Sequence, residues 1–502
     1  MVLLPVLCIT VCCFLFLHLL HWRCSVTKAA KHLPPSPAKL PLIGNLHQLG
    51  SLPHRSLHDM SKKYGPIMLL HFGNMPTLVI STADLAAEVL KAQDHIFSSR
   101  PVLKVPRRLF YGGKDIAFAP YGEYWRQCRK LAVLHLLSSK KVQSFRHIRE
   151  EELSKVIDLV SSKHTLGPID MTDVFSFLAK QTISRIIIGQ SSGKEDWYKE
   201  IEAVIKECSL MMGSFYPGDY FAWLPWLSHV TGLERKLNKT CEWADRVLET
   251  IMEKRTKEMS GGEAEECFVD IMLNIMEDES TDIYLGRDNI KAIVMDTFGA
   301  GTESTFLTMN WVMSELIRNP QVMEKLQEQI RSIAGSRSQI QEDDLTEMAY
   351  LKAVIKEALR LHPPGPLLVP REVIQDTTIR GYHIPCGALV LVNAWAIGRD
   401  PKVWDNPNDF RPDRFLGSTS RVDYKGDDFK LIPFGGGRRA CPGIGFAMPI
   451  VELAIANLLL KFDWLPDVGK AEEMNMDEVF GLTLSKKTTL YALATPHESM
   501  TN

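Results

Sequence analysis

The amino-acid sequence predicts a mainly α-helical protein with a small β part, folded as one large domain behind an N-terminal transmembrane helix. Three observations predict this class: an apolar run opens the chain, long helical patterns fill the body, and strand-like runs are few and short. Of the 502 residues, 45% are hydrophobic and 24% are charged, which suits a globular protein with a large core. The formal net charge of −2 provides no general basic field, so we expect no nucleic-acid partner.

The N-terminal apolar run covers residues 2–20, close to the roughly 20 residues that a helix needs to cross a bilayer. A cleaved secretory signal is the alternative, but the apolar core of such a signal usually spans about 7–15 residues. Arg23, Lys28 and Lys31 follow the run, and positive charge tends to stay on the cytoplasmic side. We therefore expect residues 1–22 to be a single-pass membrane anchor that leaves the body of the protein in the cytosol.

A basic and proline-rich segment over residues 23–50 comes next. Its four prolines between positions 34 and 41 fix φ and disfavour helix in the residues before them. A semi-rigid extended spacer directly after a membrane helix acts as a hinge that orients the body. Residues 51–502 show no further domain linker, so we expect them to form one domain.

Helical patterns dominate this domain. One helix is predicted over residues 288–318, with Asp288 as its N-cap and no proline inside it. Another covers residues 345–362 and stops at a Pro-Pro-Gly sequence. The clearest predicted strands are the short apolar runs at 77–81 and 388–393.

Ten cysteines are scattered through the chain, without the spacing of a zinc site or a disulfide framework. One of them, Cys441, lies in the loop FGGGRRACPG at residues 434–443. A buried inert thiol would not need these glycines, which allow φ > 0 and close approach of the backbone to a flat group. Pro442 is expected to begin the helix that follows, and Pro449 is expected to kink it.

The position of Cys441 before a helix favours a thiolate, because a helix N-terminus carries partial positive charge and free N–H groups. Arg438 and Arg439 add positive charge and could hold carboxylates. From the residues alone, Cys441 could be a buried thiol, half of a disulfide, a nucleophile or a metal ligand. A thiolate beside arginines is what a haem iron with two propionate groups would need.

The spacing of Phe434, Gly437, Arg439, Cys441 and Gly443 resembles the cysteine-ligand signature of the cytochrome P-450 superfamily. The likeness extends over the whole chain. The stretches PFGGGRRACPG, FAPYGEYWR and LRLHPPGP are similar to those of plant microsomal A-type enzymes, including menthofuran- and psoralen-forming members. The resemblance implies that haem b binds through Cys441 as the metal ligand, within a loop that includes Phe434 and Gly443.

A Glu-x-x-Arg pattern is a second family feature, but the sequence contains it four times. The pairs are Glu123–Arg126, Glu315–Arg318, Glu328–Arg331 and Glu357–Arg360. Only the last is followed by HPPGP and lies upstream of the cysteine loop. By resemblance, Arg414 should join Glu357 and Arg360 in a buried structural network behind the haem.

The sequence WRQCR is a third feature. Trp125 and Arg129 lie one helical turn apart, so their side chains project together. From the residues alone, an ordinary core tryptophan on an amphipathic helix explains the pattern equally well. The resemblance assigns both residues to the haem propionates, together with Arg371 and Arg439, since a planar guanidinium binds carboxylates bidentately.

The fourth feature is AGTEST at residues 300–305, in the middle of the long predicted helix. Glycines here weaken the helix by about 1 kcal/mol each, and tight helix packing is the alternative reason for them. By resemblance, Glu303 and a following hydroxyl deliver protons to bound oxygen. The family usually has threonine after the acid, whereas this chain has Ser304 and then Thr305, which leaves open which hydroxyl acts.

The resemblance therefore implies a haem-thiolate catalytic domain anchored in the endoplasmic reticulum membrane. It would insert one oxygen atom from O2 into a small lipophilic terpenoid, coumarin, alkaloid or phenolic compound. Electrons would come from NADPH through an FAD- and FMN-containing reductase that docks near Arg126, Lys130, Lys140 and Lys141. Candidate substrate contacts are Phe298, Ala300, Val369 and Leu482.

Two other functions remain compatible with the sequence. A haem-thiolate isomerase or dehydratase would keep the cysteine loop but would need no electrons from outside. A non-catalytic haem binder would have no use for the acid and hydroxyl at positions 303 and 304.

Overall fold

The computed structural model describes residues 32–189, 197–261, 265–278, 285–417, 422–424, 428–467 and 469–497. The predicted membrane anchor and the first part of the hinge lie outside these residues.

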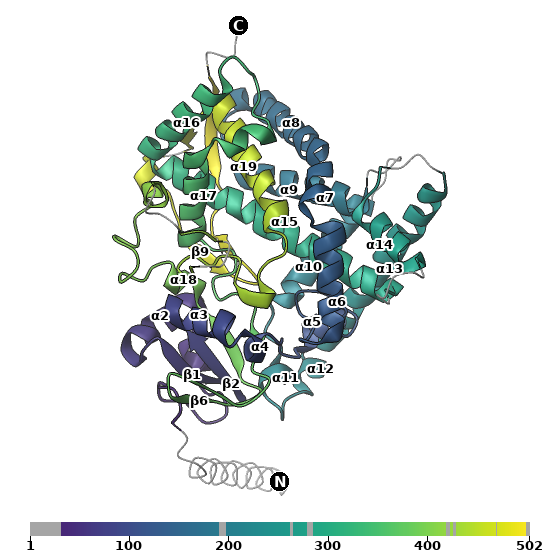
Figure 1. Ribbon diagram of the computed structural model, residues 1–502, viewed down its shortest axis with the longest axis vertical. Helices are drawn as coiled ribbons and strands as arrows, with labels where there is room; N and C mark the ends of the chain where they lie inside the picture. Colours follow the sequence, from purple (N-terminus) through teal and green to yellow (C-terminus); the bar gives the residue numbers. More distant parts are fainter. Residues whose placement is uncertain are drawn as a thin grey trace, which may run out of the picture.

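The mainly helical class with a small β part is confirmed. In Figure 1 the helices α8, α9, α15, α16, α17 and α19 gather in the upper part of the molecule, while β1, β2, α2 and α3 lie at the lower end. The long helix α15 packs along α9 and against α19, and these three supply much of the largest buried apolar cluster. The longer helices are α8 (Arg146–Lys163), α9 (Met171–Ile188), α10 (Trp197–Met212), α13 (Leu233–Gly261), α15 (Arg287–Arg318), α16 (Pro320–Ala334), α17 (Ala349–Leu361) and α19 (Ile444–Lys461).

Shorter elements complete the fold. The shorter helices are α2 (Pro53–Tyr64), α3 (Ala83–Ala87), α4 (Asp94–Phe97), α5 (Lys104–Leu109), α6 (Glu123–Leu131), α7 (Ser139–Ser144), α11 (Pro217–Tyr220), α12 (Leu227–Val230), α14 (Phe268–Glu277) and α18 (Ala394–Ile397). The strands are β1 (Ile67–Phe72), β2 (Met75–Ile80), β3 (Ile169–Asp170), β4 (Arg371–Glu372), β5 (Thr377–Ile379), β6 (Tyr382–Ile384), β7 (Leu389–Val392), β8 (Phe462–Pro466), β9 (Glu478–Phe480), β10 (Leu484–Lys486) and β11 (Tyr491–Pro496).

The largest sheet has four strands in the order β1-β2-β7-β4. It contains both predicted strands, which run parallel to one another with Val79 opposite Leu391. Alternate residues of these strands enter different apolar clusters, so that Leu78 and Ile80 face one side of the sheet and Val79 the other. Both faces of the sheet are therefore buried, as their near-continuous apolar sequences require.

Three predicted helix starts differ from the structure by one to four residues. α15 begins at Arg287, and Gly286 rather than Asp288 is its N-cap. The Asn289 side chain accepts a hydrogen bond of 2.9 Å from the Gly286 N–H. The Asp288 carboxylate instead pairs with Lys114 at 2.7 Å. α17 begins at Ala349, because the preceding residues Glu342–Thr346 form a separate short 3-10 helix.

The helix after the cysteine loop begins at Ile444 rather than at Pro442. Gly443 is its N-cap, and the Gly443 carbonyl accepts the first two helical hydrogen bonds, from the N–H groups of Phe446 and Ala447. Pro449 lies inside the helix as predicted. Among the described residues, α19 is the one helix long and apolar enough to cross a membrane, but it is mostly buried and belongs to the core.

Candidate active site

The cysteine loop is a tight turn that only glycine can complete at position 437. Gly437 has φ +65°, and a Cβ added there would lie 2.0 Å from the Leu90 carbonyl oxygen. The Cys441 N–H donates a hydrogen bond of 2.9 Å to the Phe434 carbonyl and closes the loop. The Cys441 side chain remains accessible by its surface although protein atoms surround it closely, so the loop presents the sulfur to a ligand within the protein rather than packing it as an inert thiol.

Asp94, which no sequence pattern indicated, holds this loop in place. Its side chain is buried, and one carboxylate oxygen accepts the Arg438 N–H at 3.0 Å. The other oxygen accepts Arg371 Nη1 at 2.9 Å. One acidic residue from α4 therefore joins the cysteine loop to β4, although more than 270 positions separate it from either partner.

The surroundings of Cys441 do not by themselves favour the thiolate, contrary to the expectation from the sequence. Burial raises the pKa of the Cys441 thiol above its usual value, while the Gly443 N–H and Arg129 lower it less. Asp296 of α15 also raises this pKa, which shows that α15 passes close to the sulfur. A coordinated metal cation deprotonates a thiol outright, so the positive charge that is needed would come from bound iron.

Four arginines lie together beside the loop: Arg100, Arg129, Arg371 and Arg439. The sequence analysis missed Arg100. Arg439 donates to the carbonyls of Ser98, Ile116 and Ala119, Arg100 donates to those of Ala117, Val369 and Pro370, and Arg129 donates to that of Ala440.

This arginine cluster carries uncompensated positive charge. Burial lowers the pKa of all four guanidinium groups, and repulsion from Arg371 lowers those of Arg100 and Arg439 further, that of Arg439 to about 9. Among the described residues, only Arg371 has a carboxylate at ion-pair distance, namely Asp94. Unpaired buried charge is costly, so the cluster fits a ligand that brings two carboxylates.

Two buried carboxyl groups border the cluster. Burial and repulsion from Asp296 raise the pKa of Asp115 to about 7. Burial raises the pKa of Asp296 to about 6, although two backbone N–H groups, Arg100 and Arg129 lower it. Asp296 accepts the N–H groups of Ile116 and Ala117 at 3.0 and 2.9 Å and thereby ties α15 to the segment before α6. Because these pKa values are raised, the two acids offset less of the arginine charge near neutral pH than two ordinary carboxylates would.

The Trp125 ring lies against one arginine of the cluster, Arg439. Its indole N–H donates to the Ile116 carbonyl at 3.0 Å, and Arg439 lies over its ring at 4.1 Å from the centroid. The indole N–H is therefore already used by the backbone, and a direct bond from Trp125 to a propionate stays a prediction.

The two candidate hydroxyl groups, in the middle of α15, lie in different environments. Ser304 Oγ donates to the Ala300 carbonyl at 2.7 Å, and Ser304 and Ala300 are both accessible on one face of the helix. Thr305 points into the protein interior and is 1% exposed. Glu303 accepts a hydrogen bond of 2.5 Å from Thr483, which sequence reasoning did not connect with it.

The structure distinguishes the four Glu-x-x-Arg pairs. Glu357 and Arg360 are both fully buried and joined by two hydrogen bonds of 2.7 Å, and Arg414 reaches the same carboxylate at 3.0 Å. Each of the others has a different environment or partner: Glu123–Arg126 is exposed, Glu315 bonds His362, and Arg331 bonds Asp463.

The four candidate substrate contacts do not share one environment. Val369 and Leu482 are large apolar side chains that remain 39% and 43% exposed, and Ala300 is accessible. Phe298 is 1% exposed and packs inside an apolar cluster, so packing in the core is enough to account for a phenylalanine at this position. The interior packing of Phe298 could not be told apart from a substrate wall in the sequence.

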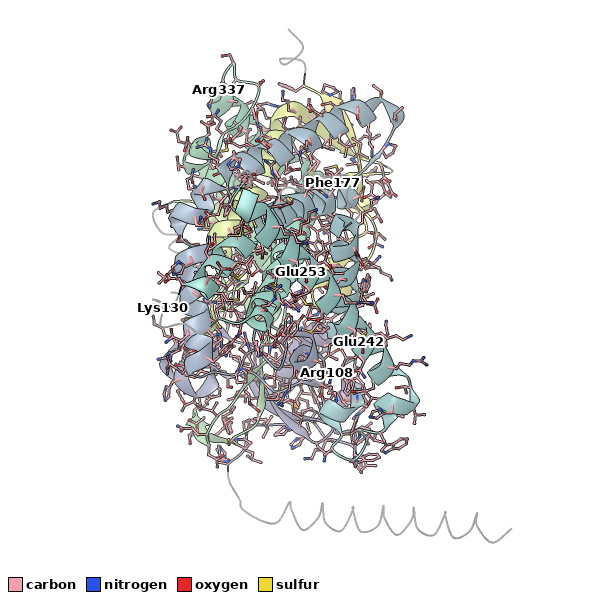
Figure 2. The ribbon with its side chains drawn as sticks, turned by 90° about the vertical axis from the view of Figure 1, so that its right-hand side faces the viewer. Arg108, Lys130, Phe177, Glu242, Glu253 and Arg337 are labelled. Atoms are coloured by element: carbon pink, nitrogen blue, oxygen red, sulfur yellow. The ribbon has the colours of Figure 1, made fainter. Side chains whose placement is uncertain are left out.

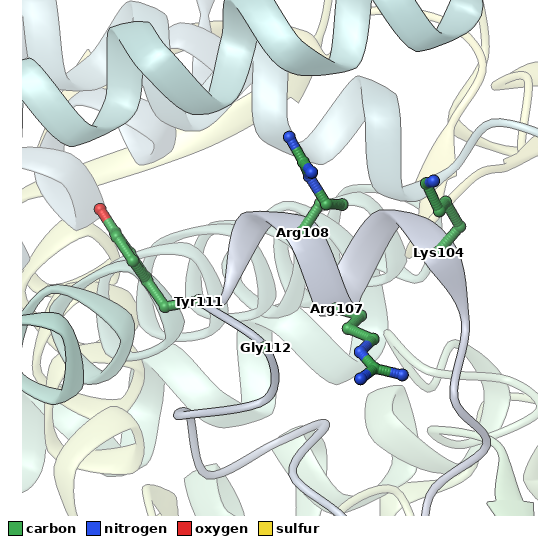
Figure 3. A pocket seen from close by; sticks show the side chains of 5 residues that line it. All are labelled: Lys104, Arg107, Arg108, Tyr111 and Gly112. Carbon is green, nitrogen blue, oxygen red and sulfur yellow. The ribbon is translucent and has the colours of Figure 1, made fainter.

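A pocket of about 470 Å³ opens beside α5 and the residues that follow it. Figure 3 shows its lining, in which three basic side chains project from α5. Lys104 pairs with Glu234 at 3.2 Å, and Arg108 donates to Asn238 at 2.8 Å. Because the charged ends of Lys104 and Arg108 are engaged by these side chains, the lining that remains accessible is mostly apolar. The lining residues are Lys104, Arg107, Arg108, Tyr111 and Gly112.

Comparisons with known proteins identify the family of the chain. The family model described as Cytochrome P-450 matches residues 34–493. The chain is 46% identical to Cytochrome P-450 71A2 of Solanum melongena, over 96% of this chain and 97% of the relative. It is 43% identical to Strychnine-11-hydroxylase of Strychnos nux-vomica, over 98% and 96% of the two chains.

A solved structure of a zebra fish cytochrome P-450 with progesterone matches with a TM-score of 0.73 and 26% identity. The match covers 89% of this chain and 99% of that one. Sequence and fold thus agree over nearly the whole length, and the relatives are named as oxidases and hydroxylases. The chain therefore belongs to the cytochrome P-450 family and is a monooxygenase of that family.

Proposed function

We propose that this protein is a membrane-anchored haem-thiolate monooxygenase of the endoplasmic reticulum that acts on a small lipophilic plant metabolite. One observation carries the proposal. The accessible Cys441 side chain, in the cysteine loop close to α15, lies beside a buried arginine cluster that has too few acidic partners. The substrate class is a terpenoid, coumarin, alkaloid or phenolic compound, and electrons come from NADPH through an FAD- and FMN-containing reductase.

The residues present fit haem b. Cys441 would bind the iron through its sulfur, and Arg100, Arg129, Arg371 and Arg439 would hold the two propionates. Among the described residues no group of three His, Cys, Asp or Glu side chains could hold a metal ion, which fits an iron carried by a porphyrin and bound through one cysteine. When bound, the haem supplies the oxygen chemistry, and a thiolate ligand favours cleavage of the O–O bond.

The side chains of α15 would deliver the protons. Ser304 lies on the accessible face with Ala300, and its hydroxyl can both donate and accept a hydrogen bond. Glu303, the adjacent acid, can pass a proton to that hydroxyl through water. Thr305 points away from this face, which supports Ser304 as the working hydroxyl.

Ser304→Ala is expected to lower the product formed per NADPH while haem content and substrate binding remain normal. Reduced oxygen then leaves as peroxide or water because the proton is no longer delivered in place. Product, NADPH and peroxide measured together give this coupling ratio. Ser304→Thr should preserve or improve it, since the added methyl group restricts χ1.

Thr305→Ala is the matched comparison for Ser304→Ala. Because Thr305 is buried, this change should cost stability rather than coupling. A coupling loss in Thr305→Ala together with normal coupling in Ser304→Ala would assign the role to Thr305 instead.

The proposed reductase surface is smaller than the sequence indicated. Arg126 is paired with Glu123, and Lys141 is paired with Glu266. Lys130 and Lys140 are exposed and have no ion-pair partner among the described residues, and Figure 2 shows Lys130 at the outer edge of the molecule. The exposed side chains Val133 and Leu134 lie between them in the chain. These four residues form the surface that we propose for the reductase.

The substrate itself is best found by screening. Microsomes that contain the protein and a reductase would be incubated with NADPH and a panel of terpenoids, coumarins, alkaloids and phenolics. The relative that is named a strychnine hydroxylase supports including indole alkaloids in this panel.

A further inference from the structure

A β-hairpin near the C-terminus joins the candidate substrate wall to the acid of α15. The hairpin consists of β9 and β10, with Phe480 opposite Leu484. Its turn residues, 481–483, contain both Leu482, a candidate substrate contact, and Thr483, whose hydroxyl donates to Glu303 at 2.5 Å. Thr483 is the one hydrogen-bond partner that the described residues give to this carboxylate.

On its other side the turn lies beside Gly213, the residue just after α10. A Cβ added to Gly213 would lie 3.3 Å from the backbone nitrogen of Leu482, so a larger residue there would press on the turn. Leu482 nevertheless remains 43% exposed, so a ligand can contact it.

The base of the hairpin is fixed by a buried ion network. The Glu478 side chain is 1% exposed and accepts from His54 at 3.2 Å and from Arg55 at 2.7 Å. His362 lies 3.9 Å from the other Glu478 oxygen. Burial alone would raise the pKa of Glu478, but these neighbours lower it to about 2, so the carboxylate is ionised at neutral pH.

The network continues to the part of α15 beyond the acid. His362 bonds Glu315 at 2.7 Å and stacks on Trp311, with the ring centroids 4.0 Å apart. The Trp311 indole N–H donates to the Leu484 carbonyl at 3.2 Å. The Leu484 N–H in turn donates to the Pro364 carbonyl at 2.9 Å. The strand that follows Thr483 is thus fixed to α15 and to the end of α17.

We infer that Thr483 is a positioning residue for Glu303, on a hairpin whose base is fixed by Glu478. Leu482 lies in the same turn, so a substrate that contacts Leu482 shifts Thr483, the hydrogen-bond partner of Glu303. Binding of the substrate and readiness to deliver protons are thereby linked through two consecutive residues, Leu482 and Thr483. This inference rests on the proposed function, in which Glu303 serves proton delivery.

The test compares Thr483→Val with Thr483→Ser in the haem-loaded protein, with reductase, NADPH and the panel compound that gives most product. Valine keeps the branched shape but removes the hydroxyl donor. We expect product per NADPH to fall about fivefold in Thr483→Val, as the loss of one hydrogen bond implies, and to return in Thr483→Ser. Normal coupling in Thr483→Val, with the thiolate–haem spectrum retained, would overturn the inference.

Glu478→Gln tests the base of the hairpin separately. This variant should accelerate hydrogen exchange of the backbone in residues 477–487 and lower coupling as well. Thr483→Val should lower coupling while exchange at Leu484 stays slow, since the bond from Leu484 to Pro364 is untouched. Unchanged exchange in Glu478→Gln would refute the role assigned to Glu478.

A double-mutant cycle keeps the contact testable without turnover. Thr483→Val and Glu303→Ala, which removes the acceptor, are measured singly and together by urea denaturation of the holoprotein, and non-additivity reports their interaction. Strict additivity would contradict the contact. If the wild-type protein forms product at full rate without NADPH, the proposed function fails, whereas the cycle still reports whether Thr483 holds Glu303.

Discussion

Cys441→Ser is expected to abolish the carbon-monoxide difference band of thiolate-bound ferrous haem, together with all turnover. Serine preserves the shape of the loop and its hydrogen bond to Phe434, but a neutral hydroxyl cannot replace the thiolate ligand. The measurement is the reduced carbon-monoxide difference spectrum of the purified protein at known haem content.

Two other cysteines serve as controls for this substitution. Cys386 is exposed and Cys128 is buried in an apolar cluster, so together they sample both environments. Cys386→Ser and Cys128→Ser should retain the band. A normal band in Cys441→Ser would exclude Cys441 as the ligand.

Glu357→Gln is expected to have the largest effect on stability. The substitution leaves the volume unchanged but strands the Arg360 guanidinium, which is 1% exposed and has no other carboxylate at ion-pair distance among the described residues. Breaking a buried ion pair from one side costs about 3–5 kcal/mol. We therefore expect a large loss in the free energy of unfolding and little haem-loaded protein.

The matched control is Glu123→Gln, which breaks a Glu-x-x-Arg pair of the same spacing on the surface. Both of its side chains are more than half exposed, so the substitution should leave unfolding unchanged within error. Urea denaturation of the two variants in one buffer makes the comparison. Equal effects of the two substitutions would mean that the Glu357 network is not a structural element.

The fold class could be predicted because it depends on local patterns. The long proline-free helical pattern of α15 and the short apolar runs of β2 and β7 are visible in the sequence itself. Helix starts were less predictable, because caps depend on individual hydrogen bonds. The Asp288 side chain suits an N-cap, but its carboxylate pairs with Lys114. At the start of the helix it is the Asn289 side chain that accepts a hydrogen bond, from the Gly286 N–H.

The site was predictable only where a motif spans a few residues. Cys441 and Glu357 belong to such motifs, whereas Asp94 and Arg100 reach the cysteine loop and its arginine cluster from distant parts of the chain. The contact from Thr483 to Glu303 spans 180 positions, and no spacing in the sequence could indicate it. Side-chain partners at such separations follow from the packing of the helices and not from local pattern.

In the proposed reaction the protein uses electrons from a reductase to insert oxygen into its substrate. The most direct measurement incubates the purified protein and a panel compound under isotopically labelled O2, with NADPH and reductase present together or omitted in turn. Product is expected only when both are present, with one labelled oxygen atom in a hydroxylated product. Product formed at full rate without NADPH and reductase would contradict the proposed reaction and would indicate an isomerase or dehydratase.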